Sequence, residues 1–180
     1  MAHGFVIWLT GLPSSGKTTL AMALDSSLKE RGLPVEVLDG DELRQSLSAD
    51  LGFSARDRQE HARRVIYLSK ILTRNGIVVI VPLISPYRKT RRLARCQLKH
   101  FVEVFVKCPL EECIRRDPKG LYAKAFRGEI SAMTGVSDPY EEPDSPEVTV
   151  ETNVLSIDQC VQRILEGVVE SGHILAGRCD

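Results

Sequence analysis

FVIWLTGLPSSGKTTL, residues 5–20, organises the whole chain. Its first five residues, Phe5–Leu9, are apolar and predict a short strand that is buried on both faces. Residues Gly11–Thr18 follow at once with the pattern G-x-x-x-x-G-K-T, and a helical pattern follows that. A strand, a glycine loop and a helix in this order are the context in which a P-loop binds phosphate. The alternative is a glycine- and serine-rich turn that only opens a helix.

Each residue type in this loop suits phosphate binding. The two glycines allow backbone angles that a Cβ would block, so that successive N–H groups turn inward around an anion. The helix that follows adds the positive end of its dipole. Lys17 can reach the β and γ phosphates of a nucleotide, and the Thr18 hydroxyl can ligate Mg²⁺. We therefore predict that ATP is bound by Gly11, Leu12, Pro13, Ser14, Ser15, Gly16, Lys17, Thr18 and Thr19.

The bulk composition is that of an ordinary soluble domain. The 180 residues suit a single domain, 1–180, with 43% apolar and 27% charged residues. The net charge of zero argues against a broad nucleic-acid surface. The five cysteines form no C-x-x-C pair, so we expect neither a zinc site nor a disulfide framework, but reduced thiols in a cytoplasmic protein. The chain shows no apolar run of membrane-spanning length and no signal peptide.

Strands and helices are predicted to alternate along the rest of the chain. Further buried strands are expected at 34–38, 77–84, 101–108 and 147–151. Pro82 suggests that the regular part of the strand at 77–84 ends by Val81. Helices are expected at 17–31, 42–47, 55–74, from 86, at 109–117 and from 157. This order predicts an α/β, three-layer P-loop kinase fold, with a mostly parallel five-stranded sheet and helices on both faces.

Local signals mark where these helices begin and where the pattern breaks. Ser54 and Ser156 each precede a capping-box residue at the third helical position. Ser85-Pro86 is interpreted as an N-cap followed by a proline at the first helical position. Lys119–Gly135 follows neither the helix nor the strand period and predicts a mobile, partly helical lid over about residues 117–136.

Two carboxylates follow the second strand. Asp39 and Asp41 flank a glycine at its carboxyl end, on the edge of the sheet where the P-loop must lie. One of them is expected to serve Mg²⁺ directly or through water, and the other to accept a proton from an attacking hydroxyl. We favour Asp39 for the metal and Asp41 for the proton. The alternative is a turn in which Asp41 only caps the next helix.

Basic residues gather near the same edge. Guanidinium groups suit phosphate and sulfate oxygens, and their clustering in a chain of zero net charge would indicate a small anionic acceptor. The residues concerned are Arg44, Arg58, Arg63, Arg64 and Arg88. The alternative is a set of solvated helix faces. Phe53, on a polar loop, would either stack on a flat ring or plug the core.

Several ordered blocks resemble the adenylyl-sulfate kinase family. They run from the P-loop to about Thr152: DGDELR at 39–44, DLGFSARDR at 50–58, RR at 63–64, ISPYR at 84–88, KGLY at 119–122, TG at 134–135 and PYE at 139–141. The SPYR and KGLY blocks are more selective than the P-loop. The resemblance implies transfer of the ATP γ-phosphate to the ribose 3′-hydroxyl of adenylyl sulfate, with Mg²⁺ and ATP.

The resemblance also implies the residues of the site. The acceptor would be bound by Asp41, Arg44, Phe53, Arg58, His61, Ile84, Ser85, Lys119, Gly120, Leu121 and Met133. Phe53 would stack on the acceptor adenine, and Arg116 and Thr152 would lie near the ATP adenine. Related kinases are commonly homodimers, and the resemblance also implies functional coupling to ATP sulfurylase. Lys17, Asp41 and Ser85 would be the catalytic set.

Three of these residues carry a particular interpretation. Family descriptions give the serine of SPYR as a phosphoserine intermediate. We expect instead a hydrogen-bonding or capping role for Ser85, because no base lies near it in sequence. His61 stands where the family usually has Asn, and Met133 where it usually has a stacking Phe. His61 can still donate a hydrogen bond, and Met133 can cover an adenine face.

Two other functions compete with this one. The first is a P-loop kinase for another small anionic acceptor, such as a sugar acid or a nucleotide. The second is a non-catalytic nucleotide-binding regulatory domain. Intact Lys17, Thr18 and Asp41 argue against the second, and the SPYR and KGLY blocks argue against the first.

Overall fold

The computed structural model describes residues 4–173, which contain one five-stranded sheet. The strands lie in the order β2-β3-β1-β4-β5, and every pair of neighbours is parallel. The strands are β1 (Val6–Thr10), β2 (Val35–Val37), β3 (Val78–Pro82), β4 (Phe101–Lys107) and β5 (Val148–Glu151). The predicted parallel sheet is therefore confirmed.

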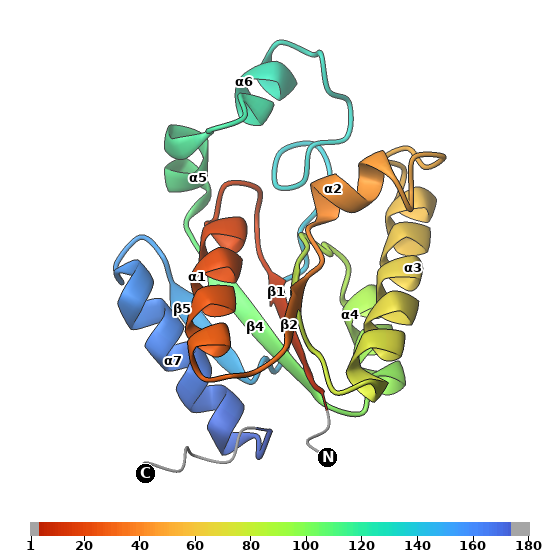
Figure 1. Ribbon diagram of the computed structural model, residues 1–180. Helices are drawn as coiled ribbons and strands as arrows, with labels where there is room; N and C mark the ends of the chain where they lie inside the picture. The colour runs from red at the N-terminus through yellow and green to blue at the C-terminus, as the bar shows by residue number, and fades with distance from the viewer. Residues whose placement is uncertain (1–3, 174–180) are drawn as a thin grey trace.

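Helices cover both faces of the sheet, as predicted (Figure 1). Helices α1 (Lys17–Glu30) and α7 (Ile157–Glu170) pack on one face, and α3 (Ala55–Arg74) and α4 (Arg88–Gln97) on the other. Alternate residues of β1 serve the two cores, since Ile7 joins the first and Trp8 the second. Because each fully buried side chain of this size contributes about 1.5–3 kcal/mol, the central strand is held firmly.

Three short helices lie at the carboxyl ends of the strands. They are α2 (Gly40–Gln45), α5 (Leu110–Arg116) and α6 (Leu121–Phe126), and α6 lies at the upper end of the molecule in Figure 1. Helix α6 lies within the predicted lid segment, so this segment is partly helical as expected, while its role as a mobile lid stays a prediction. The described chain contains no helix long and apolar enough to cross a bilayer.

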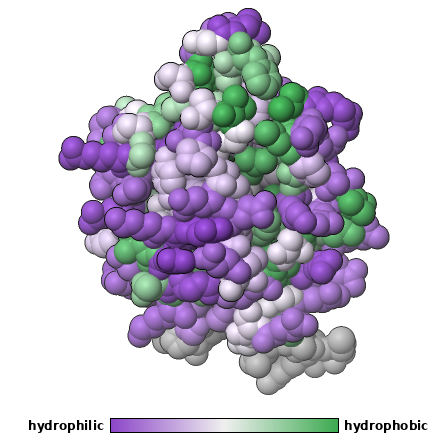
Figure 2. All heavy atoms as spheres, turned by 180° about the vertical axis from the view of Figure 1, so that it is seen from behind, coloured by the Kyte–Doolittle hydropathy of each residue, from purple (hydrophilic) through white to green (hydrophobic). Residues whose placement is uncertain are grey.

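A small core of its own supports the lid. Tyr122 and Met133 pack there against Cys108 and Cys113. The Tyr122 hydroxyl donates to the carbonyl of Pro13 at 3.1 Å, which connects the lid to the P-loop. Figure 2 shows apolar atoms gathered toward the upper end of the molecule and a mostly hydrophilic surface below.

Two predicted helix starts are wrong. Helix α2 begins at Gly40 instead of Glu42, because the carboxylate of Asp39 caps it. Helix α4 begins at Arg88 with Tyr87 as its N-cap, so Ser85-Pro86 does not open it. Ser85 has a φ of 38°, a left-handed conformation that differs from the extended backbone of an N-cap residue.

Other boundaries differ less. Pro82 is the last residue of β3 and pairs with Leu9, so the strand runs one residue further than expected. Proline is tolerated there because the strand ends at that point. Ser54 and Ser156 cap α3 and α7 as predicted, and Ser156 forms a complete capping box. Residues 1–3 and 174–180 lie outside the described part of the chain.

Candidate active site

A cavity of about 470 Å³ opens at the carboxyl ends of the strands. The P-loop and the start of α1 form one side, and α2, the first turns of α3 and the segment after β3 form the other. The predicted residues that line it are Pro13, Ser14, Gly16, Lys17, Thr18, Thr19, Asp39, Asp41, Arg44, Phe53, Arg58, His61, Ile84, Ser85, Arg116, Lys119 and Leu121. The ATP and acceptor residues therefore meet at one rim of the sheet.

The P-loop backbone requires its glycines. A Cβ at Gly11 would come within 2.4 Å of the Val106 carbonyl oxygen, because the loop passes close to β4. Gly16 is the N-cap of α1 with a φ of 98°, which a side chain would disfavour. Ser14 adopts a φ of 62° without being glycine. This conformation turns the backbone as an anion-binding loop needs.

Lys17 is buried among the carbonyls of the loop. Its ammonium donates to Gly11 O at 3.0 Å and to Leu12 O at 2.6 Å. Burial lowers the pKa of Lys17 to about 8, although Asp41 and two neighbouring thiols oppose the shift. Polyphosphate oxygens beside the ammonium would raise this pKa again, so Lys17 would be fully charged once an anion is bound.

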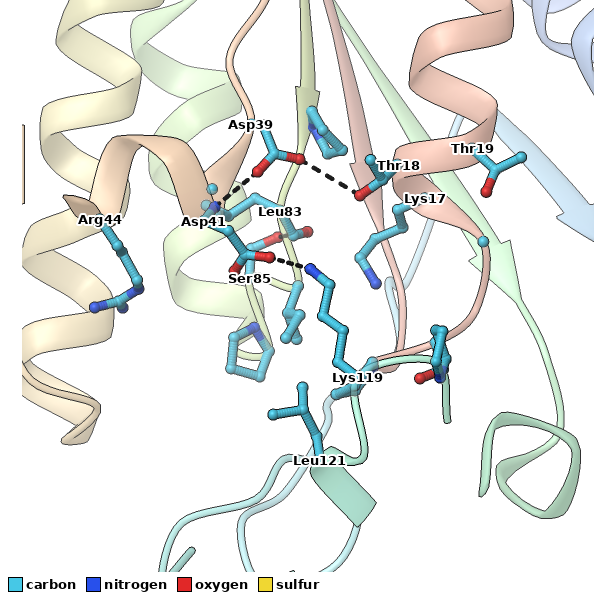
Figure 3. A pocket seen from close by; sticks show the side chains of 18 of the residues that line it. Lys17, Thr18, Thr19, Asp39, Asp41, Arg44, Leu83, Ser85, Lys119 and Leu121 are labelled. Carbon is cyan, nitrogen blue, oxygen red and sulfur yellow. Dashed lines mark hydrogen bonds and ion pairs between the residues drawn. The ribbon is translucent and has the colours of Figure 1, made fainter. Parts of the chain in front are cut away.

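One carboxylate does two tasks at the start of α2. Asp39 Oδ1 accepts from the backbone N–H of Asp41 at 2.9 Å and of Glu42 at 3.3 Å. Its Oδ2 accepts from the Thr18 hydroxyl at 3.4 Å (Figure 3). The capping bonds fix the carboxylate while its second oxygen faces the P-loop. Since Asp39 caps α2, the alternative that Asp41 only caps this helix is wrong.

The second carboxylate pairs with a lysine of the lid segment. Lys119 donates to Asp41 Oδ2, and Figure 3 shows its side chain reaching across the cavity. The hydrogen bond to Asp41 is the main reason why the pKa of Lys119 is raised. Lys119 therefore stays charged, and it forms an ion pair with Asp41 in the cavity.

Phe53 lies at the exposed rim of this cavity. Its ring is 62% exposed, so the interpretation of Phe53 as a core plug is wrong. The guanidinium of Arg44 lies 4.5 Å from the ring centroid, and its Nη1 donates to the Gly52 carbonyl at 2.8 Å. The ring is thus held in an open position where a flat ligand could stack.

Arg58 connects α3 to the lid. Its Nε donates to the Phe53 carbonyl at 2.9 Å, and its two terminal nitrogens donate to Thr134 Oγ1 at 3.1 Å and Ala132 O at 2.7 Å. Asp138 lies 3.8 Å from the same guanidinium. Arg58 therefore fixes the rim of the cavity against the loop that follows α6.

The predicted cluster of five arginines is wrong for three of its members. Arg64 binds Asp50 in a forked pair at 2.5 and 2.8 Å, and Arg88 bonds to the loop at 142–144. Arg63 is exposed on α3 and does not line the cavity. Helical spacing turns these side chains away from the edge, so only Arg44 and Arg58 lie at the rim.

Ser85 is buried in the wall after β3. Its Oγ accepts from the indole N–H of Trp8 at 2.9 Å and donates to the Leu83 carbonyl at 3.2 Å or to Thr10 Oγ1 at 3.3 Å. These bonds favour the expected hydrogen-bonding role, whereas the capping role is wrong because Tyr87 is the cap.

His61 lies beneath α2 with one nitrogen unpaired. Its Nδ1 is 2.9 Å from Ser48 Oγ, and its buried Nε2 has no protein partner in the described chain. Burial, followed by repulsion from Arg44 and Arg64, lowers the pKa of His61 to about 4. The ring is therefore neutral near pH 7, and His61 is one of the residues that line the cavity.

Six predicted residues do not line the cavity: Gly11, Leu12, Ser15, Gly120, Met133 and Thr152. Met133 is buried in the lid core, away from the position that the acceptor prediction needs. Thr152 accepts from Arg116 Nη1 at 3.2 Å and donates to the Ser15 carbonyl at 2.8 Å, so it supports the P-loop from behind. Gly40, Pro82, Leu83, Pro86 and Pro118 also line the cavity, although none of them was predicted as a site residue.

Comparisons with known proteins give one consistent family. The family model for adenylylsulphate kinase matches residues 3–151. The "Probable adenylyl-sulfate kinase" of Pyrococcus abyssi is 50% identical over 172 residues, which are 96% of this chain and 99% of that protein. The adenylyl-sulfate kinase of Synechococcus sp. strain JA-3-3Ab is 48% identical over 96% of this chain and 98% of its own length.

A solved structure agrees with these relatives. The APS kinase of Mycobacterium tuberculosis in complex with AMPPNP and APS superposes with a TM-score of 0.91 at 44% identity. The match covers 94% of this chain and 99% of that one. The similarity therefore extends over the sheet, the helices and the lid together.

Proposed function

Because this chain belongs to the adenylyl-sulfate kinase family, we propose that it transfers the γ-phosphate of ATP to the ribose 3′-hydroxyl of adenylyl sulfate. The product is 3′-phosphoadenylyl sulfate, an activated sulfate donor. One observation supports the proposal more than any other. A single cavity joins a P-loop to Asp41, Arg44, Phe53, Arg58 and Lys119, so two anionic nucleotides would meet at one rim.

The P-loop side suits ATP. Backbone N–H groups at the start of α1 and the ammonium of Lys17 would bind the β and γ phosphates. Lys17 would exchange its present carbonyl partners for phosphate oxygens. Arg116 lines the same side and would lie near the adenine, with Thr152 behind it.

The residues next to the phosphates fit Mg²⁺. The Thr18 hydroxyl and the Asp39 Oδ2 that accepts from it are hard oxygen ligands 3.4 Å apart, and a Mg²⁺ ion held by few protein ligands takes water and phosphate oxygens at its other positions. When bound, Mg²⁺ neutralises charge on the phosphate oxygens. The capping bonds from the backbone of α2 hold the Asp39 carboxylate at this position.

The opposite side suits the acceptor. Phe53 would stack on its adenine, Arg44 and Arg58 would face its phosphate and sulfate, and His61 Nε2 would form one further hydrogen bond. Asp41 would accept the proton of the 3′-hydroxyl as it attacks. Lys119 would move from Asp41 to the anionic groups of the nucleotides, which frees the carboxylate for this step.

Four finer proposals depend on the family and on composition alone. We infer a homodimer, a cytoplasmic location and a single kinase domain over 1–180, with functional coupling to ATP sulfurylase. Light scattering of the purified protein would test the first of these.

One assay separates the three functions that the sequence left open. The purified protein is incubated with Mg-ATP and a panel of acceptors, and ADP release is measured. Release only with adenylyl sulfate supports the proposal. Release with a sugar acid or another nucleotide instead would support a different kinase, and nucleotide binding without turnover would support a regulatory domain.

A further inference from the structure

The wall of the cavity between β3 and α4 adopts a conformation that needs support. Residues 82–86 line the cavity, and Ser85 within them has a φ of 38°. A left-handed backbone at a non-glycine residue costs on the order of 1–3 kcal/mol and persists only when its surroundings hold it. Residues 82–86 must therefore be held in place by groups around them.

Side-chain bonds hold part of this wall from β1. Trp8 donates its indole N–H to Ser85 Oγ, and Thr10 donates its hydroxyl to the Ile84 carbonyl at 2.7 Å. On the outer side the loop that precedes β5 lies against the wall, because Glu141 donates its backbone N–H to the Pro86 carbonyl at 2.8 Å. The Tyr140 hydroxyl lies 3.0 Å from Thr10 Oγ1.

One guanidinium connects these two segments. Arg91, on the second turn of α4, donates Nη1 to the Ser85 carbonyl and Nη2 to the Glu141 carbonyl. Its Nε donates to Glu103 Oε1 at 2.9 Å, and the guanidinium lies 5.7 Å from the Tyr140 ring centroid. Arg91 is 2% exposed, so these contacts are made away from solvent.

A buried ion pair of this kind is poorly explained by stability alone. Desolvation of two charges cancels much of their attraction, and apolar residues of similar size often serve as well. The planar fork of arginine, in contrast, can bind two carbonyls and a carboxylate at fixed angles, which lysine cannot do. Glu103 compensates the charge of the buried guanidinium, and Arg95, which also binds Glu103, has a second carboxylate partner in Glu147.

We propose that Arg91 is a positioning residue for the acceptor side of the cavity. By binding the carbonyls of Ser85 and Glu141 it holds residues 84–86 in the conformation in which they line the acceptor site. The inference rests on the proposed function, since that function assigns this wall to adenylyl sulfate. The P-loop is built on the opposite side, so ATP binding does not depend on Arg91.

The test compares Arg91→Lys with Arg92→Lys. The first variant keeps a charge beside Glu103 but loses the fork. The second changes the next residue, whose exposed side chain pairs with Asp144 on the surface. In Arg91→Lys we expect kcat/KM for adenylyl sulfate to fall on the order of 100-fold, because misplacement by about 1 Å costs this much. KM for ATP stays within about twofold. For Arg92→Lys we expect wild-type values of kcat/KM for adenylyl sulfate and of KM for ATP.

A spectroscopic signal tests the wall directly. Trp8 is the only tryptophan in the chain, and its indole N–H is bonded to Ser85. The emission of the protein without substrates should therefore shift in Arg91→Lys and not in Arg92→Lys. Equal emission in the two variants overturns the proposal. An effect on the ATP kinetics as large as the effect on kcat/KM for adenylyl sulfate overturns it as well.

A second variant tests the role of Arg91 if the first does not fold. If circular dichroism shows that Arg91→Lys does not fold, Glu103→Gln is measured instead. Glu103→Gln removes the charge that holds the guanidinium, so kcat/KM for adenylyl sulfate should fall selectively, but less than in Arg91→Lys. Unchanged acceptor kinetics would overturn the proposal. If the wild type releases no ADP with adenylyl sulfate, the proposed function fails, and the Trp8 emission alone decides the role of Arg91.

Discussion

At the scale of single residues, the two carboxylates that follow β2, Asp39 and Asp41, differ in their hydrogen-bond partners. One carboxylate oxygen of Asp39 accepts a hydrogen bond from the N-terminus of α2, and the other accepts one from Thr18. The carboxylate of Asp41, two residues later, accepts from Lys119 in the cavity and from no backbone N–H of residues 4–173. This difference is the reason why we propose the fixed carboxylate for the metal and the exposed one for the proton, because a base must reach its substrate.

Asp41→Asn tests this assignment. The amide cannot accept the proton, so we expect kcat to fall about 10²- to 10⁴-fold while ATP still binds. Steady-state kinetics and calorimetric ATP titration measure the two effects. Glu42→Gln, the neighbouring exposed residue on the same turn, is the matched control and should be unchanged. Turnover near the wild-type level in Asp41→Asn would show that another group accepts the proton.

Ser85→Ala tests whether this serine carries the phosphoryl group. Its hydroxyl is bonded to Trp8, Leu83 and Thr10, so we expect it to support the wall instead of attacking ATP. The variant should keep substantial activity, while the unpaired indole N–H lowers stability by about 1–3 kcal/mol. Kinetics and urea unfolding measure these effects. Complete loss of activity, together with a phosphoserine trapped in the wild type, would contradict this view.

At the scale of elements, the lid is connected to the body at a few points. Its core consists of four buried side chains, and Tyr122 and Arg58 bind it to the P-loop and to α3. Helix α6 has six residues and exposes Phe126. A segment with so few buried contacts belongs to the less stable part of a fold, which opens locally before the rest.

Amide hydrogen exchange tests this view of the lid. Residues 119–135 should exchange faster than β1 and β4 in the free protein, and their protection should rise when both nucleotides are bound. Helix α7, far from the cavity, is the internal control and should not change. Equal protection of the lid with and without nucleotides would contradict a mobile lid.

At the scale of the whole molecule, His61 couples stability to pH. The unfolded chain takes up a proton near the ordinary pKa of 6.5, whereas the folded protein does so only near pH 4. Between these values the unfolded state binds more protons, so the free energy of unfolding falls as the pH is lowered from about 6.5 to about 4. Below pH 4 this contribution stops changing.

His61→Asn should remove this pH dependence. Each pKa unit corresponds to about 1.4 kcal/mol, so the wild type should lose roughly 2–3 kcal/mol more than the variant between pH 7 and pH 4. Urea unfolding at several pH values measures the difference. His100→Asn, which changes a histidine outside the cavity, serves as the comparison. The same pH dependence in the wild type and in His61→Asn would show that the ring is not buried as described.

Much of the architecture could be predicted from short-range patterns in the chain. The apolar runs marked the strands of the sheet, and Ser54 and Ser156 marked two helix starts, because a cap and its partner lie within three residues. The P-loop was recognisable because its glycines, lysine and threonine all lie within residues 11–18. Where two local signals competed, the prediction was wrong: Ser85-Pro86 has the composition of a helix start, but Trp8 binds the serine from another strand.

The sequence alone was sufficient for the family, the parallel α/β fold and the pairing of a phosphate loop with two carboxylates, since these depend on residues that are close together in the chain. The folded structure was needed to choose among residues that are far apart. It placed Arg44 and Arg58 at the cavity and turned Arg63, Arg64 and Arg88 away, and it buried Met133 in the lid. The reason is physical: burial and the direction of a side chain depend on which elements pack against each other, and that packing exists only after the sheet has brought distant segments together.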